Sequence, residues 1–175
     1  VIIGAGPIGC MIIEVARKMG ASKIIVVQRS RPRLELAKKF GADVYICSSE
    51  EDSVARVLEE TNGLGADVII TSCPSPEAQV DAIHMAKNRA RVNLFGGLPK
   101  GSTITLDSNI IHYKELFVHG AHGAMPRHHQ KAVDLLAAGV IDAKQFVSHH
   151  FSLDDIQEAF AAAEGKKGMR VVVNP

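Results

Sequence analysis

Glycines near the start of the chain have the spacing of a phosphate-binding turn. Gly4, Gly6 and Gly9 form a G-x-G-x-x-G arrangement between the apolar residues 1–3 and a segment of helical periodicity at 8–19. In such a turn the first glycine permits a tight bend, the second lets the backbone approach a pyrophosphate, and the third lets a helix pack closely on a strand. Free N–H groups and the positive dipole end at the helix start would then face the phosphates. The sequence therefore predicts a dinucleotide-binding site that includes Gly4, Gly6, Pro7, Ile8 and Gly9.

Basic residues follow the second predicted strand, where sites of this type bind the adenosine ribose. The ribose is usually held by an acidic residue about 20 positions beyond the glycines. Gln28 stands at that place, and Arg29, Arg31 and Arg33 follow it at the start of the next helix. Cations at a helix start oppose the helix dipole, so a bound anion would relieve them. We predict that Arg29 and Arg33 bind the 2′-phosphate of NADP, and that Gln28 lies at the ribose position, where it cannot exclude a phosphate by charge. NAD is the alternative coenzyme, Arg31 is expected to face solvent, and a solvated arginine cluster is the competing interpretation.

Strand-like and helix-like segments alternate along the chain, which favours a parallel sheet covered by helices. The predicted strands are residues 1–3, 23–27, 43–46, 68–71, 90–95 and 116–121, followed by 146–151 and 170–173. The predicted helices are residues 8–19, 32–41, 49–61, 75–87 and 127–138, and one that begins at 152–155. This pattern predicts an α/β fold: a Rossmann doubly wound parallel sheet of six strands in the order 3-2-1-4-5-6, with a C-terminal α/β appendage. The expected domains are residues 1–122 and 123–175.

The carboxyl ends of the predicted strands extend the candidate site, because ligands bind doubly wound sheets at that edge. Ser72, Phe95, Gly96 and Gly97 lie at such ends and are predicted to line the site. Only three residues precede Gly4, fewer than an ordinary strand contains. We therefore expect the chain to be one module of a longer protein.

Composition narrows the classes of function. Among the 175 residues, 46% are hydrophobic and 22% are charged, with a net charge of +1, which argues against a general nucleic-acid surface. No apolar run reaches the roughly 18 residues that a membrane span needs. Cys10, Cys47 and Cys73 are widely spaced, which suits reduced thiols and a cytoplasmic location. The adjacent histidines at 128–129 and 149–150 point to different faces of their elements, so no metal site is expected in this chain.

Several further motifs carry a family resemblance. They are Phe40-Gly41-Ala42-Asp43, the Gly-Gly-Leu-Pro turn at 96–99 and the stretch from Phe151-Ser152-Leu153 to Ala159-Phe160. Together with the glycine turn, they resemble the zinc-type medium-chain alcohol and polyol dehydrogenases, especially the sorbitol (L-iditol) and threonine dehydrogenase branch. The resemblance covers essentially the whole chain. It matches the coenzyme domain of that family and the C-terminal segment that returns to its catalytic domain, which has no counterpart in this sequence.

The resemblance implies an oxidoreductase that transfers hydride between a polyol or secondary alcohol and NAD(P). The zinc and the catalytic residues would belong to the full-length enzyme, so this chain alone is expected to be inactive. The resemblance also implies that Arg170 reaches the coenzyme pyrophosphate and that a homodimer or homotetramer forms through the sixth strand. Two departures from the family occur: Gln28 replaces a common acidic residue, and Thr71 and Pro74 replace an acidic residue and a glycine. A zinc-free quinone or enoyl reductase and a non-enzymatic dinucleotide-sensing module remain the alternatives.

Overall fold

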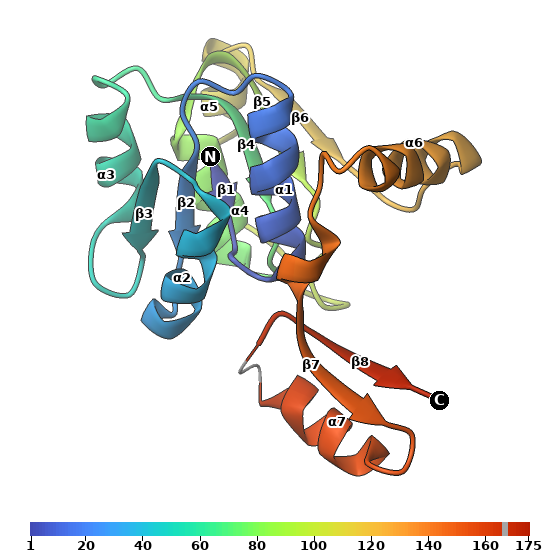
Figure 1. Cartoon of the computed structure of the whole chain (residues 1–175). Helices are drawn as coiled ribbons and strands as arrows, with labels where there is room; N and C mark the ends of the chain where they lie inside the picture. Colours follow the sequence, from blue (N-terminus) through green and yellow to red (C-terminus); the bar gives the residue numbers. More distant parts are fainter. Residues whose placement is uncertain (166–167) are drawn as a thin grey trace. The chain divides into compact units, whose positions relative to one another are not determined.

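Residues 1–123 form a parallel sheet with helices on both faces (Figure 1). The computed structural model describes residues 1–165 and 168–175, and it divides into two compact units, 1–123 and 124–175. In the first unit the strand order is β3-β2-β1-β4-β5-β6, and every neighbouring pair is parallel. The predicted Rossmann order 3-2-1-4-5-6 is thus confirmed.

The elements of this unit alternate as expected from the sequence, except that the short helix α5 was not predicted. The strands are β1 (Ile2–Ile3), β2 (Ile25–Gln28), β3 (Val44–Cys47), β4 (Ala66–Thr71), β5 (Ala86–Leu94) and β6 (Phe117–Gly120). The helices are α1 (Pro7–Lys18), α2 (Arg31–Ala37) with the 3-10 turn η1 (Lys38–Phe40), α3 (Ser53–Glu60), α4 (Pro76–His84) and α5 (Ser108–Tyr113). In Figure 1, α1 and α2 lie in front of the sheet. On the other face α4 contacts both α3 and α5.

The position of β2 in the core explains why its sequence is a run of β-branched residues. Ile25, Val26 and Val27 are all buried, because helices cover both faces of the strand. Fully buried side chains from neighbouring strands, among them Ile46 and Val92, continue the same core. The carboxyl ends of these strands are therefore held by a continuous packed layer.

The starts of two elements in this unit lie four residues from their expected positions. Helix α3 begins at Ser53 rather than near residue 49, because the Asp52 carboxylate accepts hydrogen bonds from the N–H groups of Val54 and Ala55 and thereby caps the helix. Strand β5 begins at Ala86 rather than at 90. Ala86 and Lys87, which the sequence placed at the end of a helix, enter the sheet there through an irregular register between β4 and β5.

The second unit is the α/β appendage. It contains α6 (Pro126–Ala137), a 3-10 turn at Ala143–Phe146, β7 (Val147–Ser152), α7 (Ile156–Glu164) and β8 (Arg170–Asn174). Strands β7 and β8 pair in parallel, and α7 packs on both. The capping-box pattern at 152–155 is realised differently from expectation, because the hydroxyl of Ser152 donates to the side chain of Asp155, which is itself the N-cap.

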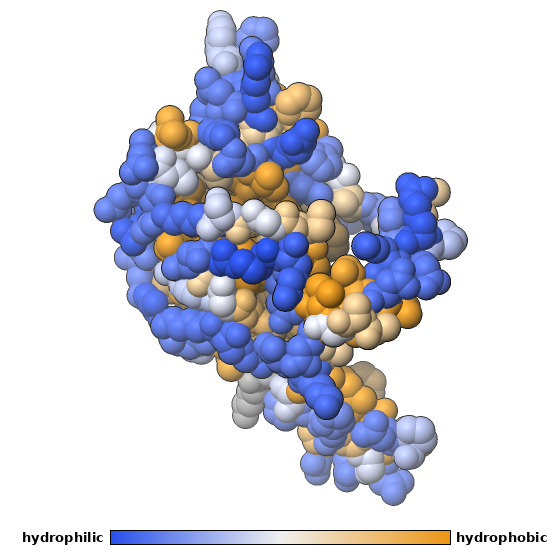
Figure 2. Space-filling model, turned by 45° about the horizontal axis from the view of Figure 1, so that its top comes forward, coloured by the Kyte–Doolittle hydropathy of each residue, from blue (hydrophilic) through white to orange (hydrophobic). Residues whose placement is uncertain are grey.

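Polar residues predominate on the face drawn in Figure 2, where apolar residues form separate patches. Large apolar side chains are exposed at several positions of the first unit. Examples are Leu64, with 72% of its surface exposed, and Phe117, with 58%. Contiguous exposed apolar surface is a common sign of an interface. Phe117 lies on the edge strand β6, so its exposure bears on assembly.

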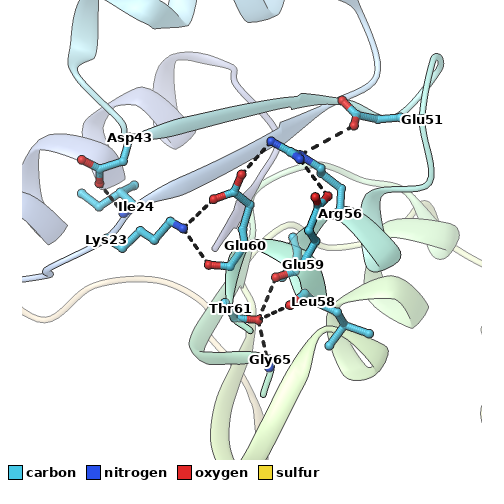
Figure 3. A network of polar contacts seen from close by, with 11 residues as sticks. Lys23, Ile24, Asp43, Glu51, Arg56, Leu58, Glu59, Glu60, Thr61 and Gly65 are labelled. Carbon is cyan, nitrogen blue, oxygen red and sulfur yellow. Dashed lines mark hydrogen bonds and ion pairs between the residues drawn. The ribbon is translucent and has the colours of Figure 1, made fainter. Parts of the chain in front are cut away.

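Ion pairs connect α3 to the start of β2 (Figure 3). The Lys23 ammonium donates to the Glu60 carboxylate at 2.5 Å, and Arg56 donates to Glu60 at 2.6 Å and to Glu59 at 2.8 Å. Arg56 also lies 3.9 Å from the carboxylate of Glu51. Isolated surface pairs contribute little, whereas several charges in one network hold geometry more effectively. The network therefore fixes α3 and the loop before it.

The hydrogen bonds of Asp43 are expected to make the free energy of unfolding depend on pH. Its carboxylate accepts from the Ile24 N–H at 2.6 Å and from Arg17 at 2.7 Å, and these two donors hold the pKa of Asp43 below its ordinary value. The native state thus binds this proton less readily than the unfolded chain. The stabilisation is complete above the ordinary aspartate pKa of about 4 and is lost as the pH falls through the lower, native value.

Asp43→Ala is expected to lower the free energy of unfolding by about 1 kcal/mol at pH 7, because two charge-assisted bonds at a largely exposed site are lost. The difference from the wild type should shrink at pH 3. Urea unfolding at both pH values measures it, with Asp154→Ala, at an exposed position, as the control. A difference that stays constant with pH would contradict the assignment.

Candidate functional site

The glycine turn joins β1 to α1. Gly4 has φ of +107°, a region that favours glycine, and its N–H donates to the carbonyl of Val27 at 2.8 Å. Gly6 is the N-cap of α1, and no described side chain caps this helix. The N–H groups of the first helical turn thus remain available to an anionic ligand.

Gly9 and Gly6 occupy contrasting surroundings. A Cβ at position 9 would overlap the carbonyl oxygen of Gly4 and lie 2.9 Å from the hydroxyl oxygen of Ser72. Ser72, at the end of β4, holds the turn by donating to the carbonyls of Ile3 (3.1 Å) and Gly4 (2.8 Å). A Cβ at position 6 would meet nothing within 4 Å. Gly9 therefore permits close packing of the helix, and Gly6 leaves space where a phosphate would approach.

Gln28, at the end of β2, is tied to the same turn. Its side-chain oxygen Oε1 accepts a hydrogen bond from the N–H of Ala5 at 2.8 Å. This bond fixes the orientation of the amide, because only the oxygen can accept. The NH₂ group of Gln28 is then the donor available to a ligand. The sequence indicated Gln28 as a site residue, but it gave no sign of this second role.

A cavity of about 600 Å³ opens at the carboxyl ends of the central strands. It brings together three of the predicted site residues: Gly4, Gln28 and Arg29. Four carboxylates that sequence reasoning did not include also line it. They are Glu51 and Asp52, just before α3, and Glu77 and Asp81 of α4. Their positions are distant in sequence from the glycines, and only the parallel stacking of strands places them at one edge.

The arginines after β2 behave differently from one another. Arg29 is exposed and lines the cavity. Arg31 is exposed, as expected, and its guanidinium forms a surface ion pair with Glu50, in which its Nε donates to Oε1 at 3.0 Å. Arg33 is half-buried and is absent from the cavity lining; its charge acts instead on the thiol of Cys10 in α1. Of the two arginines predicted to share a phosphate, the cavity therefore contains Arg29.

The remaining predicted residues lie in two places. Phe95, Gly96 and Gly97 follow β5, and the Gly96 N–H donates to the carbonyl of Thr71 at 2.7 Å. A Cβ at position 96 would lie 2.6 Å from the carbonyl oxygen of Cys73, so the segments after β4 and β5 are in close contact. Arg170 begins β8 in the second unit and is exposed. Its contact with a coenzyme stays a prediction.

Cys10 and Cys73 show no sign of activation. Burial raises the pKa of the Cys10 thiol to about 12, against the opposing influence of Arg33 and Lys39, and burial likewise raises the pKa of Cys73. Both thiols are therefore protonated at neutral pH and are poor nucleophiles.

Among residues 1–165 and 168–175, no group of three or more His, Cys, Asp or Glu side chains is placed to hold a metal ion. Over the same residues, no helix has the length and apolar character needed to cross a membrane.

Curated proteins with similar sequences are dehydrogenases of about twice this length. L-threonine 3-dehydrogenase of Bacillus licheniformis is 31% identical over 99% of the chain and 50% of its own length. Sorbitol dehydrogenase of Bacillus subtilis is 31% identical over 99% of the chain and 49% of its own length. The chain thus spans about half the length of the curated relatives it matches.

Solved structures agree with this match. Alcohol dehydrogenase TADH from Thermus sp. ATN1 superposes with a TM-score of 0.91 at 30% identity, over 99% of this chain and 50% of that one. A protein described as a zinc-binding dehydrogenase, from Sinorhizobium meliloti 1021 and bound to NADP, gives 0.87 at 28% identity over 99% and 51%.

The sequence profile of the family described as zinc-binding dehydrogenase matches residues 7–138, which include α1 and most of the sheet. That range also contains the walls of the cavity beyond the glycine turn. The geometry of the turn fits a bound dinucleotide, because Gly6 is open and the start of α1 is uncapped. The chain therefore belongs to the zinc-binding dehydrogenases, the zinc-type medium-chain family, and comprises their NAD(P)-binding domain.

Proposed function

We propose that this chain is the coenzyme-binding part of a cytoplasmic oxidoreductase that acts on a polyol or secondary alcohol and prefers NADP(H) over NAD(H). The relatives named above support the reaction class, since they are a threonine, a sorbitol and an alcohol dehydrogenase. Because the chain spans about half of such proteins, the zinc site and the substrate-binding groups are assigned to the other half.

The role of this chain is to hold the coenzyme. The bound dinucleotide supplies the nicotinamide ring that exchanges hydride with the alcohol. The start of α1 binds the pyrophosphate through its N–H groups, and Gly6 lets the phosphates approach. Gln28 and Arg29 receive the adenosine ribose and its substituent at the end of β2.

One observation carries the preference for NADP: the hydrogen bond from Ala5 to Oε1 of Gln28. It leaves the NH₂ group of Gln28 as the donor available to a ligand, in a cavity that Arg29 also lines. A 2′-phosphate offers only acceptor oxygens and carries close to two negative charges, so it suits these two donors. An acidic residue at position 28 would repel that phosphate.

Calorimetric titration of the protein with both coenzymes tests this preference. The wild type is expected to bind NADP at least about 10-fold more tightly than NAD. This ratio corresponds to the free energy of one charge-assisted hydrogen bond. Arg29→Ala should weaken NADP binding by about 10-fold and leave NAD binding unchanged. Arg31→Ala is the matched control, because Arg31 is already paired with Glu50. Equal affinities in the wild type, or tighter binding of NAD, would refute the preference.

We also infer that the protein assembles as a homodimer or homotetramer through β6. This strand lies at the edge of the sheet, where unpaired backbone groups invite pairing with another chain. Its residue Phe117 is exposed and lies 5.7 Å from the guanidinium carbon of Arg91. A two-fold axis beside this edge would bury the apolar surface.

Phe117→Lys is expected to convert the assembly to a monomer, because a lysine on an edge strand opposes pairing between chains. Sedimentation velocity over a range of concentrations measures the change. Tyr113→Lys removes another exposed aromatic side chain, from α5, and should leave the assembly intact. A wild-type protein that is monomeric at high concentration would contradict the inference.

A further inference from the structure

The far wall of the cavity carries a carboxylate whose surroundings suit a ligand. Asp81 of α4 faces the start of α3, where the hydroxyl of Ser53 donates to its Oδ2 at 3.3 Å. Oδ1 receives no hydrogen bond from the residues that the structure describes. A carboxylate can accept up to about four hydrogen bonds, so Asp81 keeps unused acceptor capacity.

Partial burial makes that capacity significant. Desolvation raises the pKa of Asp81, the neighbouring charges of Asp52 and Glu77 add to the rise, and the Ser53 hydroxyl and His84 oppose it. A new N–H donor stabilises a partly desolvated carboxylate more than an exposed one, because fewer water molecules can donate hydrogen bonds to it. A ligand that offers a donor at this wall would therefore be favoured.

The rest of the cavity indicates which part of a dinucleotide reaches this wall. The phosphates are assigned to the glycine turn, and the ribose to Gln28 and Arg29 at the end of β2. The base is the part that remains, and it extends into the cavity beyond them. Ile3, Val27 and Ala78 give this space apolar surface suited to the faces of a flat ring.

We propose that Asp81 reads the base of the coenzyme, its carboxylate accepting a hydrogen bond from the exocyclic 6-amino group of adenine. The inference rests on the proposed binding of a dinucleotide and adds a specificity-determining residue to that site. In a 6-oxo purine such as hypoxanthine, an acceptor oxygen replaces the amino donor at position 6, so the carboxylate loses the bond to that group. The protein therefore selects the adenine coenzyme over its deamino analogue.

The test is titration with NADP and with deamino-NADP, in which hypoxanthine replaces adenine. The wild type is expected to bind NADP about 10-fold more tightly, which is the effect of one polar contact at a partly exposed site. In Asp81→Asn the side-chain NH₂ can donate to the 6-oxo group, so the two affinities should become nearly equal. Circular dichroism verifies that the variant is folded.

Asp52→Asn is the matched control. It removes the same charge from the same cavity, but asparagine still caps α3, so the 10-fold ratio should persist. If Asp81→Asn does not fold, Ser53→Ala provides the second variant, since loss of the donor that positions Asp81 should reduce the ratio.

The outcomes are distinguishable. Equal affinities of the wild type for the two dinucleotides overturn the role of Asp81 and leave the proposed function intact. A ratio that falls equally in Asp52→Asn and Asp81→Asn also overturns it, because the cause would then be cavity charge. Failure of the wild type to bind either dinucleotide overturns the proposed function and this inference together.

Discussion

Gly9→Ala is expected to lower the free energy of unfolding by about 3 kcal/mol and to abolish coenzyme binding. The added methyl group would overlap the carbonyl oxygen of Gly4, and a backbone atom cannot rotate away as a flexible side chain can. Helix α1 would have to move off β1, which disrupts the turn that both elements share. Urea unfolding followed by circular dichroism measures the first effect, and titration with NADP measures the second.

Gly6→Ala is expected to weaken coenzyme binding without affecting the packing of α1, in contrast to Gly9→Ala. Position 6 has φ of −75°, which any residue adopts, and a Cβ there meets no protein atom within 4 Å. Its unfolding free energy should change by less than about 0.5 kcal/mol, while NADP affinity should fall by about 10-fold or more because the methyl group occupies the approach of the pyrophosphate. Equal stability losses in Gly6→Ala and Gly9→Ala would contradict this division of roles.

Gln28→Glu is expected to reverse the coenzyme preference. Glutamate has nearly the same shape, so its carboxylate can keep the hydrogen bond from the Ala5 N–H and preserve the turn. It loses the NH₂ donor and brings a negative charge to the 2′-phosphate. NADP affinity should fall about 10- to 100-fold, or about 1.4–2.8 kcal/mol, while NAD binding is retained, since a carboxylate accepts from ribose hydroxyls. Titration with both coenzymes gives the two changes.

Gln28→Leu supplies the contrast to that substitution. Leucine removes the acceptor as well as the donor, so the Ala5 N–H loses its partner and the turn becomes less well fixed. Both coenzymes should then bind more weakly. If Gln28→Glu weakened NAD binding as much as Gln28→Leu does, the charge-based explanation of coenzyme choice would be wrong.

The sequence predicted the parts of the fold that depend on local pattern. The β-branched run at β2 is buried on both faces, and the glycine spacing at the start of α1 has one common structural meaning. Both signals lie within a few consecutive residues, so no knowledge of the distant chain is needed to interpret them. The order of the strands was predicted from the glycine turn and the alternation of strands and helices, which together are typical of a Rossmann sheet.

Features that depend on distant pairing were less accessible. Strand β5 begins within residues that resemble a helix end, because its partner β4 decides where the strand starts. The ion pair of Arg31 with Glu50 was not predicted, because Glu50 lies 19 residues away, after the next strand. The carboxylate of Asp81 reaches the cavity from α4, and nothing near it in sequence marks it as a site residue. Local periodicity cannot predict contacts that the sheet itself creates.

The bond between Gln28 and Ala5 also limits how this domain can be re-engineered. One side chain serves two neighbouring parts of the site, so a library that randomises position 28 would mix damaged turns with altered coenzyme choice. With an N–H to oxygen distance of 2.8 Å, the side chain must keep both an acceptor and its present length. Aspartate is one methylene shorter than glutamate and would draw the strand end toward the turn. Only Gln and Glu are therefore expected to preserve the turn at position 28. Any further change of coenzyme preference has to come from substitutions at residues outside the turn.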